Sequence, residues 1–359
     1  MKKIILLTLF LALLVACESQ TETQGKQIVK IGASLPLSGD VAFLGDTARN
    51  ALELALEDVN SKSTKYQYQL IFEDDKIDAT QAATAATKLI QVDNVDALVS
   101  LSSGTGNAIS PITQASKVIH FGIASDPNVA KGEFNFIHWT PPSEEARVWI
   151  AEAQKRGIKN VGILELQHAG VKAVTDALKA QGSGKLTFTS EIIQGGEKDF
   201  RTHILKVKQT NPDIYLLMAF SPELDILHKQ MKEEGITTPL SSIEAFELSN
   251  DPAQFEGQWY VNAADANGDF NARYQAKFGK GPQTGTQNAY DILNLIVEGY
   301  ERAGSSPAQK PTHEEVVAQL MQIKDFDGVL GTLSVGDEGM VWSKAAVRTI
   351  QNGKPVTIG

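Results

Sequence analysis

The stretch ALVSLSSGTGNAISP, residues 97–111, decides how this chain folds. An apolar run with the character of a buried strand passes through small polar residues and glycines into a segment that resembles a helix. Strand, loop and helix together form part of a βαβ unit, in which parallel strands are joined by helices. Ligands of open parallel sheets bind beyond the carboxyl ends of the strands, so the loop SSGTG at residues 102–106 is a candidate binding loop.

The same alternation of strands and helices continues on both sides of this unit. Before it, the strand-like IVKIGASL begins at residue 28, and the helix-like TARNALELALEDVN follows with apolar residues at helical spacing. After it, VIHFGIAS at residues 118–125 again has the pattern of a strand, and beyond Pro141 and Pro142 the alternation begins afresh. The sequence therefore predicts an α/β protein with parallel sheets.

A chain of 359 residues with 42% hydrophobic content is long enough for two domains. The later part is helix-rich and then strand-rich, without an apparent core of its own, so it should complete the two earlier domains. We predict that lobe I comprises residues 28–141 and 265–329, and that lobe II comprises residues 142–264 and 330–359. The chain would cross between them near residues 141, 264 and 330, which form the expected hinge.

The N-terminus, MKKIILLTLFLALLVAC, places two lysines before an apolar run. The run is shorter than the roughly 20 residues that a membrane-spanning helix needs, and we predict a signal peptide over residues 1–16. Leu-Val-Ala-Cys also resembles the bacterial lipobox, which implies that Cys17 is lipidated and that residues 17–27 form a tether. An ordinary signal peptide with an incidental cysteine is the alternative.

Charge and composition exclude several classes of partner. Net charge is −10, and removal of the two positive charges of Lys2 and Lys3 with the signal leaves −12, which argues against nucleic acid and against anionic lipid bound by charge. Because Cys17 is the single cysteine, an internal disulfide is excluded. Histidines lack HxxxH or HExxH spacing, and EDD at residues 73–75 lacks the alternating ligands of a calcium loop, so we expect no metal and no cofactor.

Three kinds of chemistry suit a loop such as SSGTG. A phosphate site would need GxxxxGK[ST] or GxGxxG, and a nucleophile elbow would read GxSxG; the loop has neither pattern. A hydrolase with Ser102 as nucleophile is kept as an alternative, although no enzymatic chemistry is predicted. The hydroxyls of Ser102, Ser103 and Thr105, with the N–H groups and dipole of a helix start, suit one carboxylate. The other interpretation is that these residues only close a turn.

Further motifs accompany this loop in a set order and spacing: IGASLPLSGDVAFLGD, EDDKIDATQAATAATKLI, IASDP, GGEKDF, PDIYLLMAFSPE and AYDILNL. Together they make the chain resemble the type I periplasmic-binding-protein family, in particular the branched-chain amino-acid-binding proteins of ATP-driven importers. The likeness extends from Ile28 to nearly the C-terminus. It implies two Rossmann-like lobes with parallel sheets, a three-crossing hinge, an extracytoplasmic monomer without catalytic activity, and an ABC permease as partner.

The resemblance also implies how the ligand is held. Ser102 resembles the hydroxyl that receives the ligand's α-carboxylate, helped by backbone N–H groups near Ser103 and Ser125. Glu244, in SSIEAF, resembles the acid of the second lobe that pairs with the ligand's ammonium. Both charges of a zwitterion need partners, since an unpaired buried charge costs several kcal/mol. The alternative for Glu244 is a solvated side chain on a loop.

The pocket for the ligand's side chain departs from the usual pattern of the family. Leu44 stands where these proteins often carry an aromatic residue, and Ala169 stands near the usual Tyr, with His168 beside it. Phe220 and Tyr290 fall where aromatic contacts are expected, and packing in the core is the alternative role for each. Because Leu44 and Ala169 are smaller than the aromatic residues usual at these positions, they would leave room for a bulkier ligand.

The sequence thus predicts a lipid-anchored, extracytoplasmic protein that binds a branched-chain or related apolar amino acid between two lobes and delivers it to an ABC importer. Closure of the hinge would give the state that the permease recognises. Two alternatives remain: a ligand sensor of the same fold that reports to a membrane receptor, and a binding protein for an aromatic or aliphatic carboxylic acid that lacks an ammonium group.

Overall fold

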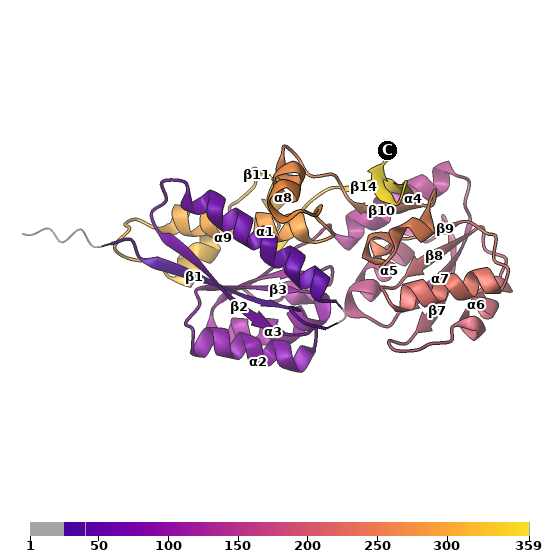
Figure 1. Cartoon of the computed structure of the whole chain (residues 1–359), viewed down its shortest axis with the longest axis horizontal. Coiled ribbons are helices and arrows are strands. Elements are labelled where there is room, and N and C mark those ends of the chain that lie inside the picture. The colour runs from indigo at the N-terminus through magenta and orange to yellow at the C-terminus, as the bar shows by residue number, and fades with distance from the viewer. Residues whose placement is uncertain (1–24, 40, 359) are drawn as a thin grey trace, which may run out of the picture.

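The computed structural model describes residues 25–39 and 41–358. The predicted signal peptide over residues 1–16 and the lipidated Cys17 lie outside the described residues, as does most of the tether. Within the described ranges, no helix combines the length and the apolar character that a membrane crossing requires. Two α/β lobes lie side by side along the long axis of the molecule (Figure 1), and this arrangement confirms the predicted fold class.

Lobe I is built on an eight-stranded sheet with the order β11-β12-β13-β5-β4-β3-β1-β2. Its parallel part consists of β1 (Ile28–Leu35), β2 (Gln67–Asp74), β3 (Ala97–Leu101), β4 (Ile119–Ile123) and β5 (Asn135–His138). The far edge is formed by β11 (Phe326–Gly328), β12 (Gly331–Val335) and β13 (Met340–Trp342). Every residue of β3 and β4 is buried, which explains why both strands are continuous apolar runs.

Helices cover both faces of this sheet (Figure 1). The helices of lobe I are α1 (Ala42–Asn60), α2 (Ala79–Gln91), α3 (Ser103–Ser116), α8 (Phe270–Phe278), α9 (Thr286–Ala303) and α10 (His313–Leu320), with the short η1 (Pro127–Ala130). On one face α1 packs against α9, and on the other α2 packs against α3. The helix-rich segment after residue 265 therefore packs into the core of lobe I.

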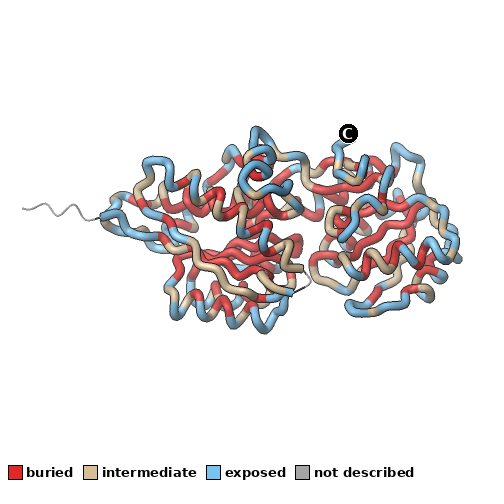
Figure 2. The backbone as a smooth tube through the Cα atoms, in the orientation of Figure 1, coloured by how far each residue is buried: buried red, intermediate tan, exposed pale blue. Residues whose placement is uncertain are grey.

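Lobe II contains a parallel sheet and a smaller antiparallel one. The parallel sheet has the order β7 (Thr187–Ile193), β6 (Asn160–Leu166), β8 (Ile214–Met218), β9 (Leu240–Ser241), and the antiparallel sheet joins β10 (Trp259–Ala263), β14 (Ala345–Gln351) and β15 (Lys354–Thr357). Its helices are α4 (Pro142–Lys155), α5 (Ala169–Gly182), α6 (Arg201–Lys208) and α7 (Glu223–Glu233), with η2 (Ala245–Leu248) and η3 (Pro252–Phe255). Buried backbone runs through the centre of each lobe (Figure 2).

The third chain crossing differs from the expected one near residue 330. Strand β13 pairs in parallel with β5, and β12 pairs with β13, so residues 331–342 belong to the sheet of lobe I. The chain enters lobe II only at β14, and the crossing lies at Ser343 and Lys344. Lys344 O accepts a hydrogen bond of 2.8 Å from the N–H of Ala264, which ties the third crossing to the second. Sequence patterns predict strands after about residue 331, but they do not show which sheet these strands join.

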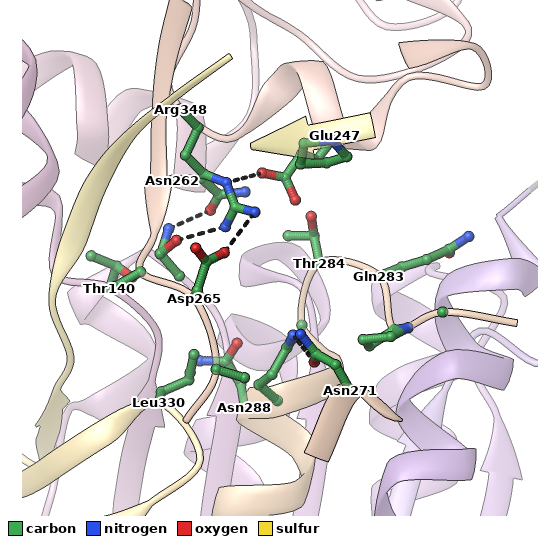
Figure 3. Close-up of a pocket in the computed structure, with 18 of the residues that line it drawn as sticks. Thr140, Glu247, Asn262, Asp265, Asn271, Gln283, Thr284, Asn288, Leu330 and Arg348 are labelled. Carbon is green, nitrogen blue, oxygen red and sulfur yellow. Dashed lines mark hydrogen bonds and ion pairs between the residues drawn. The ribbon is translucent and has the colours of Figure 1, made fainter. Parts of the chain in front are cut away.

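A polar cavity of about 480 Å³ lies beside these crossings. Figure 3 shows the guanidinium of Arg348, from β14, facing Glu247 and Asp265. Its Nε lies 3.3 Å from Glu247 Oε1 and its Nη2 lies 3.1 Å from Asp265 Oδ1, while its Nη1 donates to Ala263 O at 3.0 Å. Arg348 thus links the strand after the third crossing to residues at the second.

Candidate functional site

A cavity of about 350 Å³ lies between the lobes, at the carboxyl ends of parallel strands from both sheets. Lobe I contributes the loops after β3 and β4, and lobe II contributes those after β6 and β8. Most of the lining is apolar, which is usual for a small-molecule site. Seven of the nine predicted ligand residues line it: Leu44, Ser102, Ser103, Ser125, His168, Phe220 and Glu244.

Ser102 joins β3 to α3 with its φ at 93°, in the left-handed region that serine rarely adopts. Its Oγ accepts the N–H of Gly104 at 3.2 Å and caps α3, while its own N–H donates to Ile123 O at 3.0 Å and joins the two binding loops. Ser102 therefore closes the turn and also lines the cavity. The two interpretations of SSGTG are compatible rather than exclusive.

Ser103 and Ser125 are two buried hydroxyl residues of the site. Ser103 is 2% exposed and Ser125 is 9% exposed. The Ser103 Oγ accepts the N–H of Asp126 at 3.1 Å, which leaves its hydroxyl hydrogen free to donate to a ligand oxygen. Hydroxyl donors and the positive end of the α3 dipole thus meet here, and both favour a single negative charge.

Gly170, in the first turn of α5, brings lobe II against these serines. A β-carbon at position 170 would lie 2.6 Å from Ser125 Oγ and 2.8 Å from Ser103 Oγ, closer than side chains pack. Only a glycine lets the start of α5 approach the lobe I loops to this distance. The N-termini of α3 and α5 therefore face the same part of the cleft from opposite lobes, and both add positive potential there.

Glu244 precedes η2 and is 7% exposed, with φ at 65°. Its Oε1 accepts a hydrogen bond from the indole Nε1–H of Trp139. Burial raises the pKa of Glu244, and the hydrogen bond from Trp139 and the interaction with the neighbouring carboxyl of Glu145 oppose that rise. The structure thus places Glu244 as a buried carboxyl in the cleft and not as a solvated side chain.

Trp139 is a residue that the sequence interpretation missed. It directly follows β5, so it lies at the same sheet edge as the loops after β3 and β4, and it lines the cavity. In the sequence, the neighbouring Pro141 and Pro142 indicate a domain boundary. The feature that could identify Trp139 is its position, because an aromatic residue at the carboxyl end of a predicted parallel strand is a candidate ligand contact.

His168 caps α5, and its Nδ1 accepts the N–H of Gly170 at 3.2 Å. Burial lowers the pKa of His168, so the ring is neutral near pH 7 and carries its proton on Nε2. The ring meets Phe220 edge-on, with centroids 5.2 Å apart. These two residues build the lobe II wall of the cavity, opposite Leu44.

Two predicted contacts do not line this cavity. Tyr290 donates its hydroxyl to Asp58 Oδ2 at 2.5 Å, and its ring packs on Phe270. It therefore faces α1 and α8 on the other side of lobe I, because α9 turns this residue away from the cleft. Ala169 is the first residue of α5, and its neighbours His168 and Gly170 make the contacts with the cleft and with lobe I instead.

Tyr290→Phe is expected to lower the free energy of unfolding by about 1.5 kcal/mol, the value of a hydrogen bond to a charged group. Ligand affinity should be unchanged, because Tyr290 lies outside the cleft. Urea unfolding and a binding titration on the same variant check both statements. A loss of affinity with unchanged stability would indicate that Tyr290 contacts the ligand after all.

The sequence profile of the family described as "Periplasmic binding protein" matches residues 28–354. The Leu/Ile/Val-binding protein BraC3 of Rhizobium johnstonii is 25% identical over 338 residues, which cover 88% of this chain and 90% of the relative. The leucine-, isoleucine-, valine-, threonine- and alanine-binding protein of Pseudomonas aeruginosa is 24% identical over 358 residues, covering 89% and 91% of the two chains.

Solved structures with the same fold include proteins whose descriptions name different kinds of ligand. The leucine binding protein LivK of Thermotoga maritima superposes with a TM-score of 0.81 at 21% identity, covering 92% of this chain and 98% of the other. A solute binding protein of R. palustris in complex with benzoate superposes with a TM-score of 0.79 at 18% identity, covering 92% and 96%. These comparisons confirm the resemblance drawn from the motifs, and at such identity the structures show the fold alone.

Proposed function

This chain belongs to the periplasmic binding protein family, and from that premise we propose that it binds a branched-chain or related apolar amino acid between its lobes and delivers it to an ABC importer. Membership of the family makes it an extracytoplasmic solute-binding protein. The identity of the solute and the lipid anchor at Cys17 are parts of the proposal. Closure of the lobes over the ligand would give the state that the permease recognises.

The observation that carries the proposal is that one cavity contains both a site for a negatively charged group and a site for a positively charged group. Hydroxyls and two helix N-termini lie where Ser103, Ser125 and Gly170 meet, and the buried carboxyl of Glu244 also lines the cavity. An α-amino acid carries one carboxylate and one ammonium, so it can pair with the hydroxyl and helix N-terminal donors and with Glu244 at the same time. An unmatched charge in such a site would cost several kcal/mol, which favours a zwitterion over a simple acid.

The remaining lining supports an apolar ligand side chain. Leu44 and Phe220 are joined there by further apolar residues, namely Val41, Phe43, Ile77, Leu101, Ile123, Leu166 and Leu248. Burial of apolar ligand surface contributes roughly 25 cal/mol per Å². The names of the relatives from Rhizobium johnstonii and Pseudomonas aeruginosa agree with an amino acid of this kind.

A carboxylic acid without an ammonium group is the second candidate. One observation favours it: Glu244 already accepts a hydrogen bond from Trp139, so its carboxyl is partly satisfied without a cation. The same fold also holds benzoate in the R. palustris protein. A sensor of the same fold would use the same cleft and would differ only in the membrane protein that reads the closed state.

The test is a thermal-shift screen of a chain that begins at Gln27, against the twenty amino acids and a panel of aliphatic and aromatic acids. A ligand at 100 times its dissociation constant adds about 2.7 kcal/mol to the free energy of unfolding. Stabilisation by leucine, isoleucine or valine supports the proposal. Stabilisation only by acids without an ammonium group would replace it with the second candidate.

Trp139→Phe is expected to weaken amino-acid binding about tenfold. The change keeps an aromatic ring but removes the N–H donor to Glu244, and a hydrogen bond to a charged group contributes about 1.5 kcal/mol or more. Calorimetric titration measures the effect. Trp342→Phe is the matched control, because Trp342 is 43% exposed on β13; equal losses in both variants would contradict a specific role for Trp139.

A further inference from the structure

Glu145 is a buried acid next to the site that no step of the proposed binding mode uses. It lies in the first turn of α4 and is 0% exposed. Neither of its carboxyl oxygens accepts a hydrogen bond from an N–H or O–H group among the residues that the structure describes. A carboxylate in such a place would be a desolvated charge without a donor, whereas a neutral carboxylic acid has a far smaller desolvation cost.

The carboxyl group of Glu145 lies within hydrogen-bonding reach of the carboxyl group of Glu244. Two ionised carboxylates offer only acceptors, so a hydrogen bond between them requires a proton on one of the pair. Glu244 has the indole N–H of Trp139 as a donor and Glu145 has none. The negative charge is therefore better stabilised on Glu244, and the proton belongs on Glu145.

Surrounding charges do not alter this assignment. On the same helix, Glu144 is held by the guanidinium of Arg147 at 2.8 Å. On η2, Glu247 is engaged by Arg348 and by the hydroxyl of Tyr260. Burial raises the pKa of Glu145 well above its usual range, and Glu244 and Glu144 raise it further.

We propose that Glu145 is protonated at neutral pH and donates its O–H to Glu244, so that it positions the carboxylate that receives the ligand's ammonium. The pair then carries one negative charge, which matches one ammonium group. This inference rests on the proposed function for its role in binding, but the proton on Glu145 can be tested without any ligand. Glu145 is thus a positioning and specificity-determining residue behind the cleft.

The first test is the pH dependence of unfolding in the ligand-free protein. In the folded protein Glu145 holds a proton that the unfolded chain releases above pH about 4.5. The contribution of this group to the free energy of unfolding is therefore fully present below that pH and decreases as the pH rises. Glu145→Gln keeps a donor but removes the titration. The fall in melting temperature between pH 5 and pH 8 should therefore be smaller in this variant than in the wild type.

Glu144→Gln is the matched control for this profile. Its ion pair with Arg147 lowers the pKa of Glu144, so that group is ionised in folded and unfolded chains throughout pH 5 to 8. The control should retain most of the fall of the wild type, because the charge of Glu144 is the smallest of the contributions that raise the pKa of Glu145. A Glu145→Gln profile as steep as that of the wild type would overturn the assignment of the proton.

The second test is affinity for the amino acid that gives the largest thermal shift. Glu145→Gln should bind within about threefold of the wild type, whereas Glu145→Leu, which fills the space without a donor, should bind at least tenfold more weakly while its ligand-free form stays folded. Wild-type affinity in Glu145→Leu would overturn the positioning role. If no amino acid binds at all, the proposed function is wrong. The pH profile of unfolding still tests whether Glu145 is protonated in the folded protein.

Discussion

Glu244→Gln is expected to lower the affinity for amino acids by a factor of about 30 or more. The substitution preserves the shape of the side chain and removes the charge that would pair with the ligand's ammonium in a buried site. Truncating one partner of a desolvated charge pair costs 2–5 kcal/mol, and each 1.4 kcal/mol corresponds to a factor of ten. Isothermal titration with the best amino acid from the screen measures the loss.

The stability of the ligand-free protein should not fall in this variant, because the substitution removes a desolvated charge and the glutamine amide oxygen can still accept the hydrogen bond from Trp139. Glu223→Gln is the matched control: this carboxyl also lines the cavity, but its Oε1 accepts the N–H of Gly196 at 2.7 Å. A large loss in Glu223→Gln with little change in Glu244→Gln would move the ammonium site to Glu223. Unchanged affinity in both variants would favour a ligand without an ammonium group.

Gly170→Ala is expected to weaken ligand binding at least tenfold while leaving the ligand-free protein as stable as the wild type, or more stable. The added methyl group would lie 2.6 Å from Ser125 Oγ and 2.8 Å from Ser103 Oγ, so the lobes could not close to the observed distance. Alanine is also a better helix former than glycine by roughly 0.5–1 kcal/mol. Affinity and stability should therefore change in opposite directions.

A binding titration and a melting curve on the same preparation test this opposition, and small-angle scattering with saturating ligand would report how far the lobes close. Gly195→Ala serves as the control, because its β-carbon would meet nothing within 4 Å and the residue is exposed in the same lobe. Normal affinity in Gly170→Ala would mean that ligand binding does not require the contact between α5 and the lobe I serines.

Local sequence patterns predict most of the fold because the periodicity of apolar residues and the residues of turns depend on interactions between near neighbours in the chain. The alternation of apolar strands with amphipathic helices gave the α/β class, and the turn chemistry of residues 102–106 placed a helix start at the end of β3. Long-range pairing is different. The strands after residue 330 carry no local mark of their partners, and only the pairing of β13 with β5 shows that residues 331–342 belong to lobe I.

Some residues of the candidate site are likewise predictable from local sequence patterns, and others depend on tertiary packing. The small polar loops at residues 102–106 and 123–128 are recognisable because each follows an apolar strand, and both line the cleft. Trp139 lies on a strand end that we treated as a boundary. Tyr290 was predicted from its place in a motif, but the face that α9 presents to the cleft depends on the packing of α9 against α1.

By itself, therefore, the sequence determined the α/β class, the two lobes, the resemblance to a family and the loops that carry hydroxyls at strand ends, since these depend on contacts between near neighbours in the chain. Tertiary structure alone decided the course of the third crossing, the contact of Gly170 with Ser103 and Ser125, and the meeting of Trp139, Glu145 and Glu244. Those features join segments up to about 200 residues apart, as in the pairing of Met340 with Ile137, and burial at such a junction determines which groups remain charged.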